Sequence, residues 1–315
     1  MDKNRCVVWD YARGIAITMI VLYHLIGYAD RVYASIPVSI CHTAQIPIFM
    51  YVSGVLSVST LKRYRWDSLL INKSIRLLFP FVSFTIIWGI IDPSGIIPML
   101  LDQFKSGYWF VLVLFEIISV FALLNEIKML LRISSLYVIV FFYCILSIYV
   151  YFVPNDFVIN RLLSINLLWH YFPFFVIGFY STKIAAIFCI RFSLLYFFIY
   201  ACAQYYYFKT DNSVALLFCN FFSLAFYMSI FQGGVRPLVS VFSKIGVYSL
   251  QIYLIHYLLI ELIVPHLPVL LNYYLDFSLL LVLVSIIIMF SIIISKFLMK
   301  NKILAMALFG VMKQR

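Results

Sequence analysis

The stretch WDYARGIAITMIVLYH, residues 9–24, combines an apolar run with polar side chains that are costly inside a membrane. It belongs to a hydrophobic segment, 7–29, that is long enough to cross a bilayer core of about 30 Å as a helix. Arg13 and His24 are eleven residues apart, so a helix places both on one face, about 16 Å apart along its axis. Asp10 lies three residues before Arg13 and can pair with it. The stretch therefore predicts a membrane helix with a charge near one surface and a titratable base past the bilayer middle.

The whole chain has the composition of a membrane protein. Of its 315 residues, 65% are hydrophobic and 11% are charged, whereas about a quarter of an ordinary globular sequence is charged. No polar stretch is long enough for a separate soluble domain, so residues 1–315 are predicted to form a single, all-α, membrane-embedded domain. Ten apolar segments are predicted to span the bilayer, at 7–29, 43–60, 69–91, 108–125, 134–153, 162–181, 185–208, 213–232, 238–264 and 273–298.

The net charge of +11 is distributed unevenly between the two ends of these segments. Of the 23 Lys and Arg residues, 18 fall on the side that holds both termini, four fall on the other side, and Arg13 lies within the first segment. Cytoplasmic loops of membrane proteins carry such an excess, so both termini are predicted to be cytoplasmic. Topology thus explains the basic excess, and the expected partner is the lipid bilayer, not nucleic acid.

His24 is the strongest candidate for chemistry. A neutral imidazole at this position could take a proton from an alcohol or attack a thioester directly. The alternative is a histidine that only forms a hydrogen bond to a neighbouring helix. For Arg13, the alternative is a charge that reaches back to the membrane surface, with Asp10 as its partner.

A second candidate site precedes and enters the third segment. Lys73 and Arg76 are three residues apart on one helical face, and Arg76 is followed at once by apolar residues that place its charge at the membrane edge. Arg suits a bidentate grip on phosphate. A cytoplasmic pocket of Arg13, Lys73 and Arg76 would therefore suit a multiply phosphorylated donor. The basic cluster at 62–65 is explained more simply as a determinant of topology.

Other polar residues within predicted spans include Glu116, His170, His256 and Glu261. For each, hydrogen bonding between helices is favoured over catalysis. The five histidines of the chain show no HxxxH or HxxEH spacing, so no metal site is expected.

Six segments follow one another with the spacing of a known family. They are the Arg13-to-His24 segment, Pro47 to Gly54, Lys73 to Leu77 with Pro80, Tyr108 to Phe110, Pro173 to Gly178, and Ser249 to His256. Together they resemble the acyltransferase 3 family of integral membrane proteins, over nearly the whole chain. One departure is the basic pair, which reads Lys-x-x-Arg where Arg-x-x-Arg is common, so Lys73 offers a point charge in place of a planar fork.

The resemblance implies a bacterial multi-pass protein of the inner membrane that transfers an acyl group to oxygen. The donor is usually acetyl-CoA, with no permanently bound cofactor, and the acceptor is a sugar hydroxyl of a surface polysaccharide or its lipid-linked precursor. Some family members carry an additional periplasmic hydrolase-like domain. This chain ends at Arg315 without one, so transfer is expected to be completed by the helical domain or by a separate partner.

A transporter or flippase for a glycolipid or small solute is the alternative function. In that case Arg13, His24 and Glu116 would line a transport pathway, because intramembrane charges occur in such pathways too. Acyl transfer from labelled acetyl-CoA distinguishes the two functions.

Overall fold

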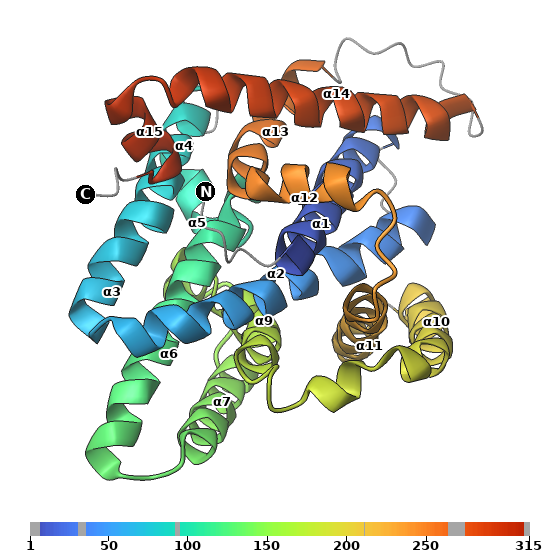
Figure 1. The fold of residues 1–315 in the computed structure, drawn as a ribbon. Helices are drawn as coiled ribbons and strands as arrows, with labels where there is room; N and C mark the ends of the chain where they lie inside the picture. Colours follow the sequence, from blue (N-terminus) through green and yellow to red (C-terminus); the bar gives the residue numbers. More distant parts are fainter. Residues whose placement is uncertain (1–6, 31–35, 92–94, 211, 264–274, 312–315) are drawn as a thin grey trace. The chain divides into compact units, whose positions relative to one another are not determined.

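The computed structural model of the protein describes residues 7–30, 36–91, 95–210, 212–263 and 275–311, and in these ranges the regular elements are all helices (Figure 1). Eight predicted spans coincide largely with one helix each: α1 (Val7–Asp30), α2 (Ile36–Arg63), α6 (Trp109–Leu131), α7 (Ser135–Phe152), α9 (Ile165–Phe179), α10 (Ser193–Thr210), α11 (Ser213–Gln232) and α14 (Leu275–Leu298). The other two predicted spans are divided. Residues 69–91 fall in α3 (Trp66–Lys73), the π-helix η1 (Ser74–Leu78) and α4 (Phe79–Ile91), and residues 238–264 fall mainly in α12 (Val239–Val247) and α13 (Ser249–Ile263).

Shorter elements connect or follow these helices. They are α5 (Ile96–Leu101), α8 (Val158–Leu162), α15 (Lys302–Phe309) and the 3-10 turns η2 (Lys105–Gly107), η3 (Ala185–Phe188) and η4 (Ile190–Phe192). Within the described residues, six helical stretches are long and apolar enough to cross a membrane, or seven if α12 and α13 count as one broken span. The all-α, multi-pass class is thereby confirmed. The count of ten spans and the cytoplasmic termini stay predictions, and residues 1–6 and 312–315 lie outside the described ranges.

Two predicted spans are less regular than their hydropathy suggests. Residues 238–264 do not form one straight helix, because α12 and α13 meet at an angle of 80° around Tyr248. In the segment 185–208, two 3-10 turns precede α10, which begins at Ser193. Most residues around both breaks are apolar, so the hydrophobic pattern alone does not locate them.

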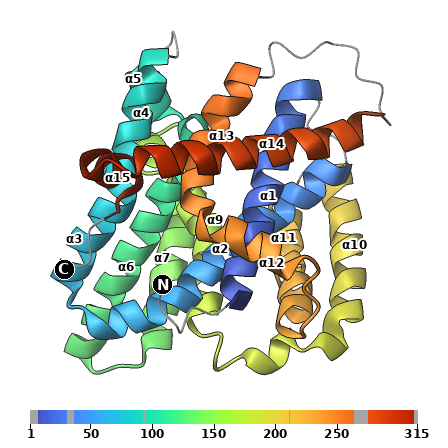
Figure 2. The same cartoon turned by 45° about the horizontal axis from the view of Figure 1, so that its top comes forward.

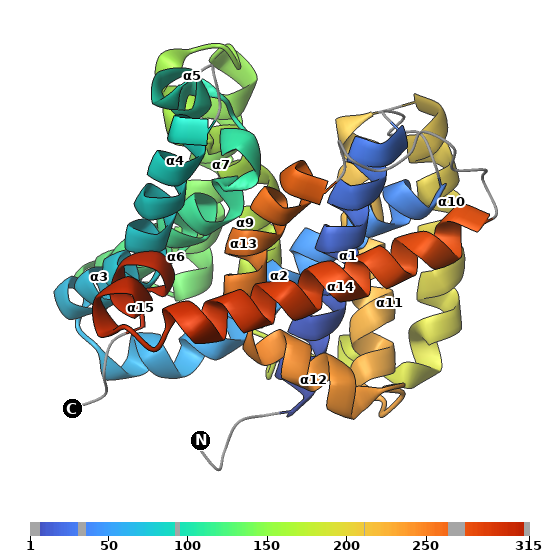
Figure 3. The same ribbon diagram turned by 90° about the horizontal axis from the view of Figure 1, so that it is seen from above.

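The contacts of the chain divide it into two compact units. Unit 1 consists of the described residues of Met1–Val55 and Ile177–Phe297. In it α1 packs against α12 and α13 (Figure 1), and α10 lies beside α11 (Figure 2). Unit 2 consists of the described residues of Leu56–Val176 and Leu298–Arg315. In it α6 packs against α7, and the last helix, α15, contacts both α4 and η1 (Figure 3).

Glycines allow the close packing of α1 in unit 1. A Cβ atom on Gly14 would lie 1.9 Å from the carbonyl oxygen of Phe242, and one on Gly246 would lie 1.8 Å from that of Asp10. No side chain fits at such distances, so the two helix backbones touch directly. This contact fixes α1 against α12 at the level of Asp10 and Arg13.

Candidate functional site

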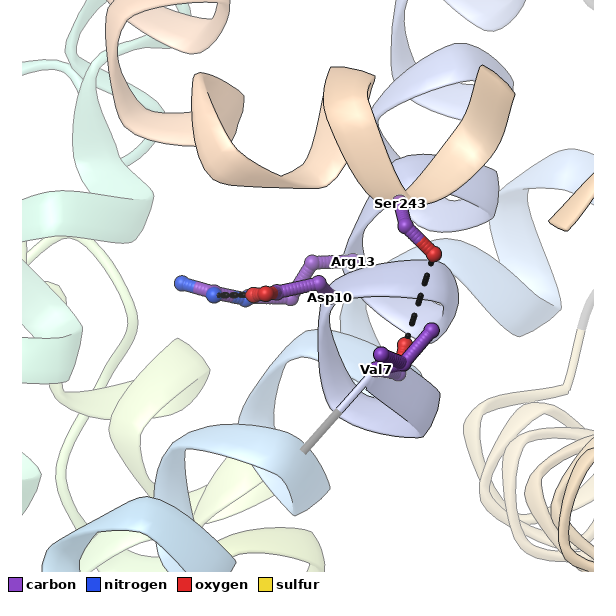
Figure 4. Close-up of polar contacts among 4 residues, drawn as sticks. All are labelled: Val7, Asp10, Arg13 and Ser243. Atoms are coloured by element: carbon purple, nitrogen blue, oxygen red, sulfur yellow. Dashed lines mark hydrogen bonds and ion pairs between the residues drawn. The ribbon is translucent and has the colours of Figure 1, made fainter. Parts of the chain in front are cut away.

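Helix α1 carries three of the predicted site residues on one unbroken helix. The guanidinium of Arg13 donates a hydrogen bond to the carboxylate of Asp10 and forms an ion pair with it, as the three-residue spacing predicts (Figure 4). Asp10 is buried, and 21% of the Arg13 side chain is exposed. In Figure 4 this pair points away from the side of α1 where the Ser243 hydroxyl donates to the carbonyl oxygen of Val7 at 3.5 Å. Arg13 is therefore neutralised locally, yet its side chain reaches the surface of unit 1.

His24 lies further along α1, in a group of histidines and tyrosines. Its ring centroid is 5.4 Å from that of His256 on α13 and 5.4 Å from that of Tyr257. Tyr23 stacks on His42 of α2, with ring centroids 5.6 Å apart. We call His24, His42 and His256 the histidine cluster. Within the described residues, no group of three or more His, Cys, Asp or Glu side chains could hold a metal ion.

The hydrogen bonds of His256 define the state of its ring. Nδ1 lies 3.0 Å from the carbonyl oxygen of Ile252 and 2.7 Å from that of Tyr253. A carbonyl oxygen only accepts, so Nδ1 carries the hydrogen of a neutral ring and Nε2 keeps the lone pair. Nε2 is buried and has no hydrogen-bond partner among the described residues. Among the described residues, the His256 ring bonds only to carbonyls of its own helix α13, so the hydrogen bond between helices expected from the sequence is not formed there.

The basic pair lies in unit 2, where the helix geometry changes. Lys73 ends α3, and Arg76 belongs to the π-helix that follows. Single π-turns inside longer helices occur often at functional sites. Arg76 is exposed and makes no ion pair or hydrogen bond with its side chain in the described part of the chain, so its guanidinium is open to an anion.

The end of the chain supports this basic segment. Gly310 follows α15, and a Cβ atom there would lie 2.4 Å from the Cα atom of Arg76. The Ser83 hydroxyl donates to the carbonyl oxygen of Ala307 at 2.9 Å, which ties α4 to the same helix. Sequence reasoning missed this support. The only available signal was the glycine after the helix, a common helix end that does not reveal what it contacts.

Lys105 and Glu116 form a second polar group of unit 2. Lys105 is fully buried, and its ammonium donates to the carbonyl oxygens of Asp102, at 2.6 Å, and of Arg161. Burial lowers the pKa of Lys105 to about 8, against the opposing effect of the Asp102 and Glu116 carboxylates. Both carboxylate oxygens of Glu116 are buried without a hydrogen-bond partner among the described residues, so the helix-to-helix bond predicted for Glu116 is not formed.

The predicted site residues are thus divided between the two units. Asp10, Arg13 and His24 belong to unit 1, and Lys73 and Arg76 belong to unit 2. The roles assigned to them, including a shared donor pocket of Arg13, Lys73 and Arg76, stay predictions.

The chain is thus a multi-pass helical protein whose first helix carries Arg13 and His24 eleven positions apart. A model of the acyltransferase domain of the acyltransferase 3 family matches residues 8–296, and the chain belongs to this family. This family assignment favours the acyltransferase over the transporter alternative.

Two curated relatives share about a quarter of their residues with this chain over the matched region. The chain is 27% identical over 195 residues to a nodulation protein, NolL, of Mesorhizobium japonicum, a match that covers 56% of this chain and 48% of the relative. It is 26% identical over 194 residues to the NolL protein of Sinorhizobium fredii, covering 56% and 49%. The matches thus span about half the length of these relatives. No solved structure matches the chain.

Proposed function

We propose that the protein transfers an acetyl group from acetyl-CoA to a sugar hydroxyl of a surface polysaccharide or its lipid-linked precursor, in a bacterial inner membrane. The observation that carries this proposal is the position of His24. It shares α1 with the Arg13–Asp10 pair, and its ring faces the ring of His256, which keeps a buried lone pair. Neutral imidazoles in a membrane-embedded acyltransferase are suited to acyl transfer between a thioester and a hydroxyl.

His24 is the proposed catalytic residue, and two routes use its ring. In the direct route, His24 takes the proton of the hydroxyl while the hydroxyl oxygen attacks the thioester carbonyl and the thiolate of CoA leaves. In the covalent route, a His24 nitrogen attacks the thioester first, and the acetyl group then moves from the imidazole to the hydroxyl. Asp10 holds Arg13 in place on the same helix in both routes.

Lys73 and Arg76 are the proposed ligands of the CoA phosphates, with Arg13 as a third. Arg76 is exposed and free of an ion pair within the described ranges, so a phosphate would meet no competing carboxylate there. Arg13 already neutralises Asp10. We therefore expect Arg13 to contribute less to phosphate binding than Arg76 does.

Transfer of label tests the proposal directly. Membranes that contain the protein are incubated with acetyl-CoA labelled in the acetyl group, and the glycan and lipid fractions are then separated and counted. We expect label in the glycan or lipid-linked sugar fraction, and none from membranes without the protein. Uptake of a solute without any acetyl transfer would contradict the proposal and support the transporter alternative.

A further inference from the structure

We propose that His256 is a second catalytic residue, whose Nε2 atom accepts the proton of the acceptor hydroxyl. This inference rests on the proposed function and assigns the two neighbouring imidazoles to different steps. Its starting point is the fixed state of the His256 ring, in which two backbone carbonyls of α13 hold the hydrogen on Nδ1. Because the tautomer is fixed, Nε2 is always the acceptor of the neutral ring.

The Nε2 atom is placed to receive a ligand. His256 is 1% exposed, and Nε2 has no hydrogen-bond partner among the described residues. Buried polar atoms are nearly always paired, and an unpaired one is costly. A group that brings its own hydrogen-bond donor would remove this cost. The lone pair therefore indicates a binding position for a donor group beside His24, whose ring centroid is 5.4 Å away.

The chemistry of the two substrates decides which one binds there. At its reacting end, an acyl-CoA thioester carries a carbonyl oxygen and a sulfur, which accept hydrogen bonds and do not donate them. A sugar hydroxyl donates one. Unprotonated Nε2 can only accept a hydrogen bond. It therefore pairs with the sugar hydroxyl, which donates one, and not with the thioester. The rings of Tyr253 and Tyr257 also lie near the His256 ring, with centroids 5.9 and 6.2 Å from its own.

This arrangement leads to a balanced covalent route. A His24 nitrogen first attacks the thioester, the carbon–sulfur bond breaks, and CoA leaves as its thiolate. The acceptor oxygen then attacks the acetyl carbonyl on His24 while its proton moves to His256 Nε2, and the carbon–nitrogen bond breaks with its electron pair on His24. The carbonyls of Ile252 and Tyr253 stabilise the resulting imidazolium, because a charged Nδ1–H is a stronger donor. The thiolate or water finally takes the proton from His256.

Two substitutions separate this role from packing. His256→Asn keeps an N–H near the position of Nδ1 and removes the Nε2 acceptor. His256→Gln places a carbonyl oxygen near Nε2, which accepts a hydrogen bond but does not take a proton near neutral pH. The same change at another buried histidine, His170→Asn, is the matched control.

Two half-reactions are measured with labelled acetyl-CoA. Purified protein without glycan reports release of the CoA thiol and labelling of the protein, and membranes of the native host report transfer to the natural acceptor. In both His256 variants we expect CoA release within about threefold of the wild type and transfer at least about 100-fold slower. Acetyl-His24 should therefore accumulate and be detected by peptide mass spectrometry, whereas His170→Asn should transfer normally.

Wild-type transfer by His256→Asn would overturn the proposal. Equal loss of CoA release and transfer in both variants would also overturn it, because His256 would then serve the donor step or the fold. If the wild-type protein itself neither releases CoA nor transfers acetyl, the proposed function fails and not the role of His256 alone.

Discussion

The first helix of unit 1 and the basic segment of unit 2 both carry an arginine next to a close backbone contact, but the surroundings of the two arginines differ. Each places an arginine at a backbone contact made possible by a distant glycine: Gly246 touches the backbone of Asp10, beside Arg13, and Gly310 touches the backbone of Arg76. In unit 1 the arginine is paired with a buried carboxylate on a regular α-helix. In unit 2 it is exposed on a π-helix. The difference fits the two roles proposed above, a catalytic role for the helix that carries Arg13 and His24, and binding of the anionic donor by the segment that carries Arg76.

Alanine at the two glycines should separate these roles. In Gly246→Ala the new Cβ meets the Asp10 carbonyl, so α1 and α12 must move apart, at a cost of about 1–3 kcal/mol in stability. We expect a lower thermal midpoint and a lower kcat, because α1 also carries His24. In Gly310→Ala the clash is with the Arg76 backbone, so the main effect should be a higher KM for acetyl-CoA.

Gly234→Ala is the control for the second change. Gly234 and Gly310 both have a positive φ, +93° and +60°, but a Cβ atom at Gly234 meets nothing within 4 Å. Backbone strain alone should therefore leave the KM for acetyl-CoA unchanged. Identical kinetic effects of Gly234→Ala and Gly310→Ala would show that the Arg76 contact is irrelevant to donor binding.

Arg76→Ala should raise the KM for acetyl-CoA by about 10- to 100-fold, the equivalent of a charge-assisted hydrogen bond worth about 1.5–3 kcal/mol. Arg76→Lys should be only partly tolerated, because it keeps the charge and loses the planar fork. Steady-state kinetics with acetyl-CoA measure both.

Arg63→Ala should have the smallest effect, since its role is assigned to topology. Equal shifts in KM at Arg63 and Arg76 would instead indicate a diffuse positive surface. The contrast between a defined anion site in unit 2 and a catalytic helix in unit 1 would then be lost.

Much of the fold follows from the sequence because hydropathy reports directly on membrane helices. All ten predicted segments contain helix, but their mean hydropathy does not reveal the bend near Tyr248 or the π-helix at Ser74–Leu78. At the site, helical spacing was enough to pair Asp10 with Arg13. The lone pair of His256 depends on backbone carbonyls of its own helix, and the Gly310 contact joins residues far apart in sequence. Neither leaves a periodic signal.

The central claim is that His24 performs acetyl transfer to a surface glycan. The most direct measurement is mass analysis of the surface glycan from host cells that carry the wild-type gene, no gene, or the His24→Ala variant, with protein levels in the membrane checked for each. The account predicts acetylated glycan with the wild-type gene, and loss of at least about 99% of it with His24→Ala, which inserts normally because removing a polar group eases insertion. Acetylated glycan at the wild-type level in cells that carry only His24→Ala would contradict it.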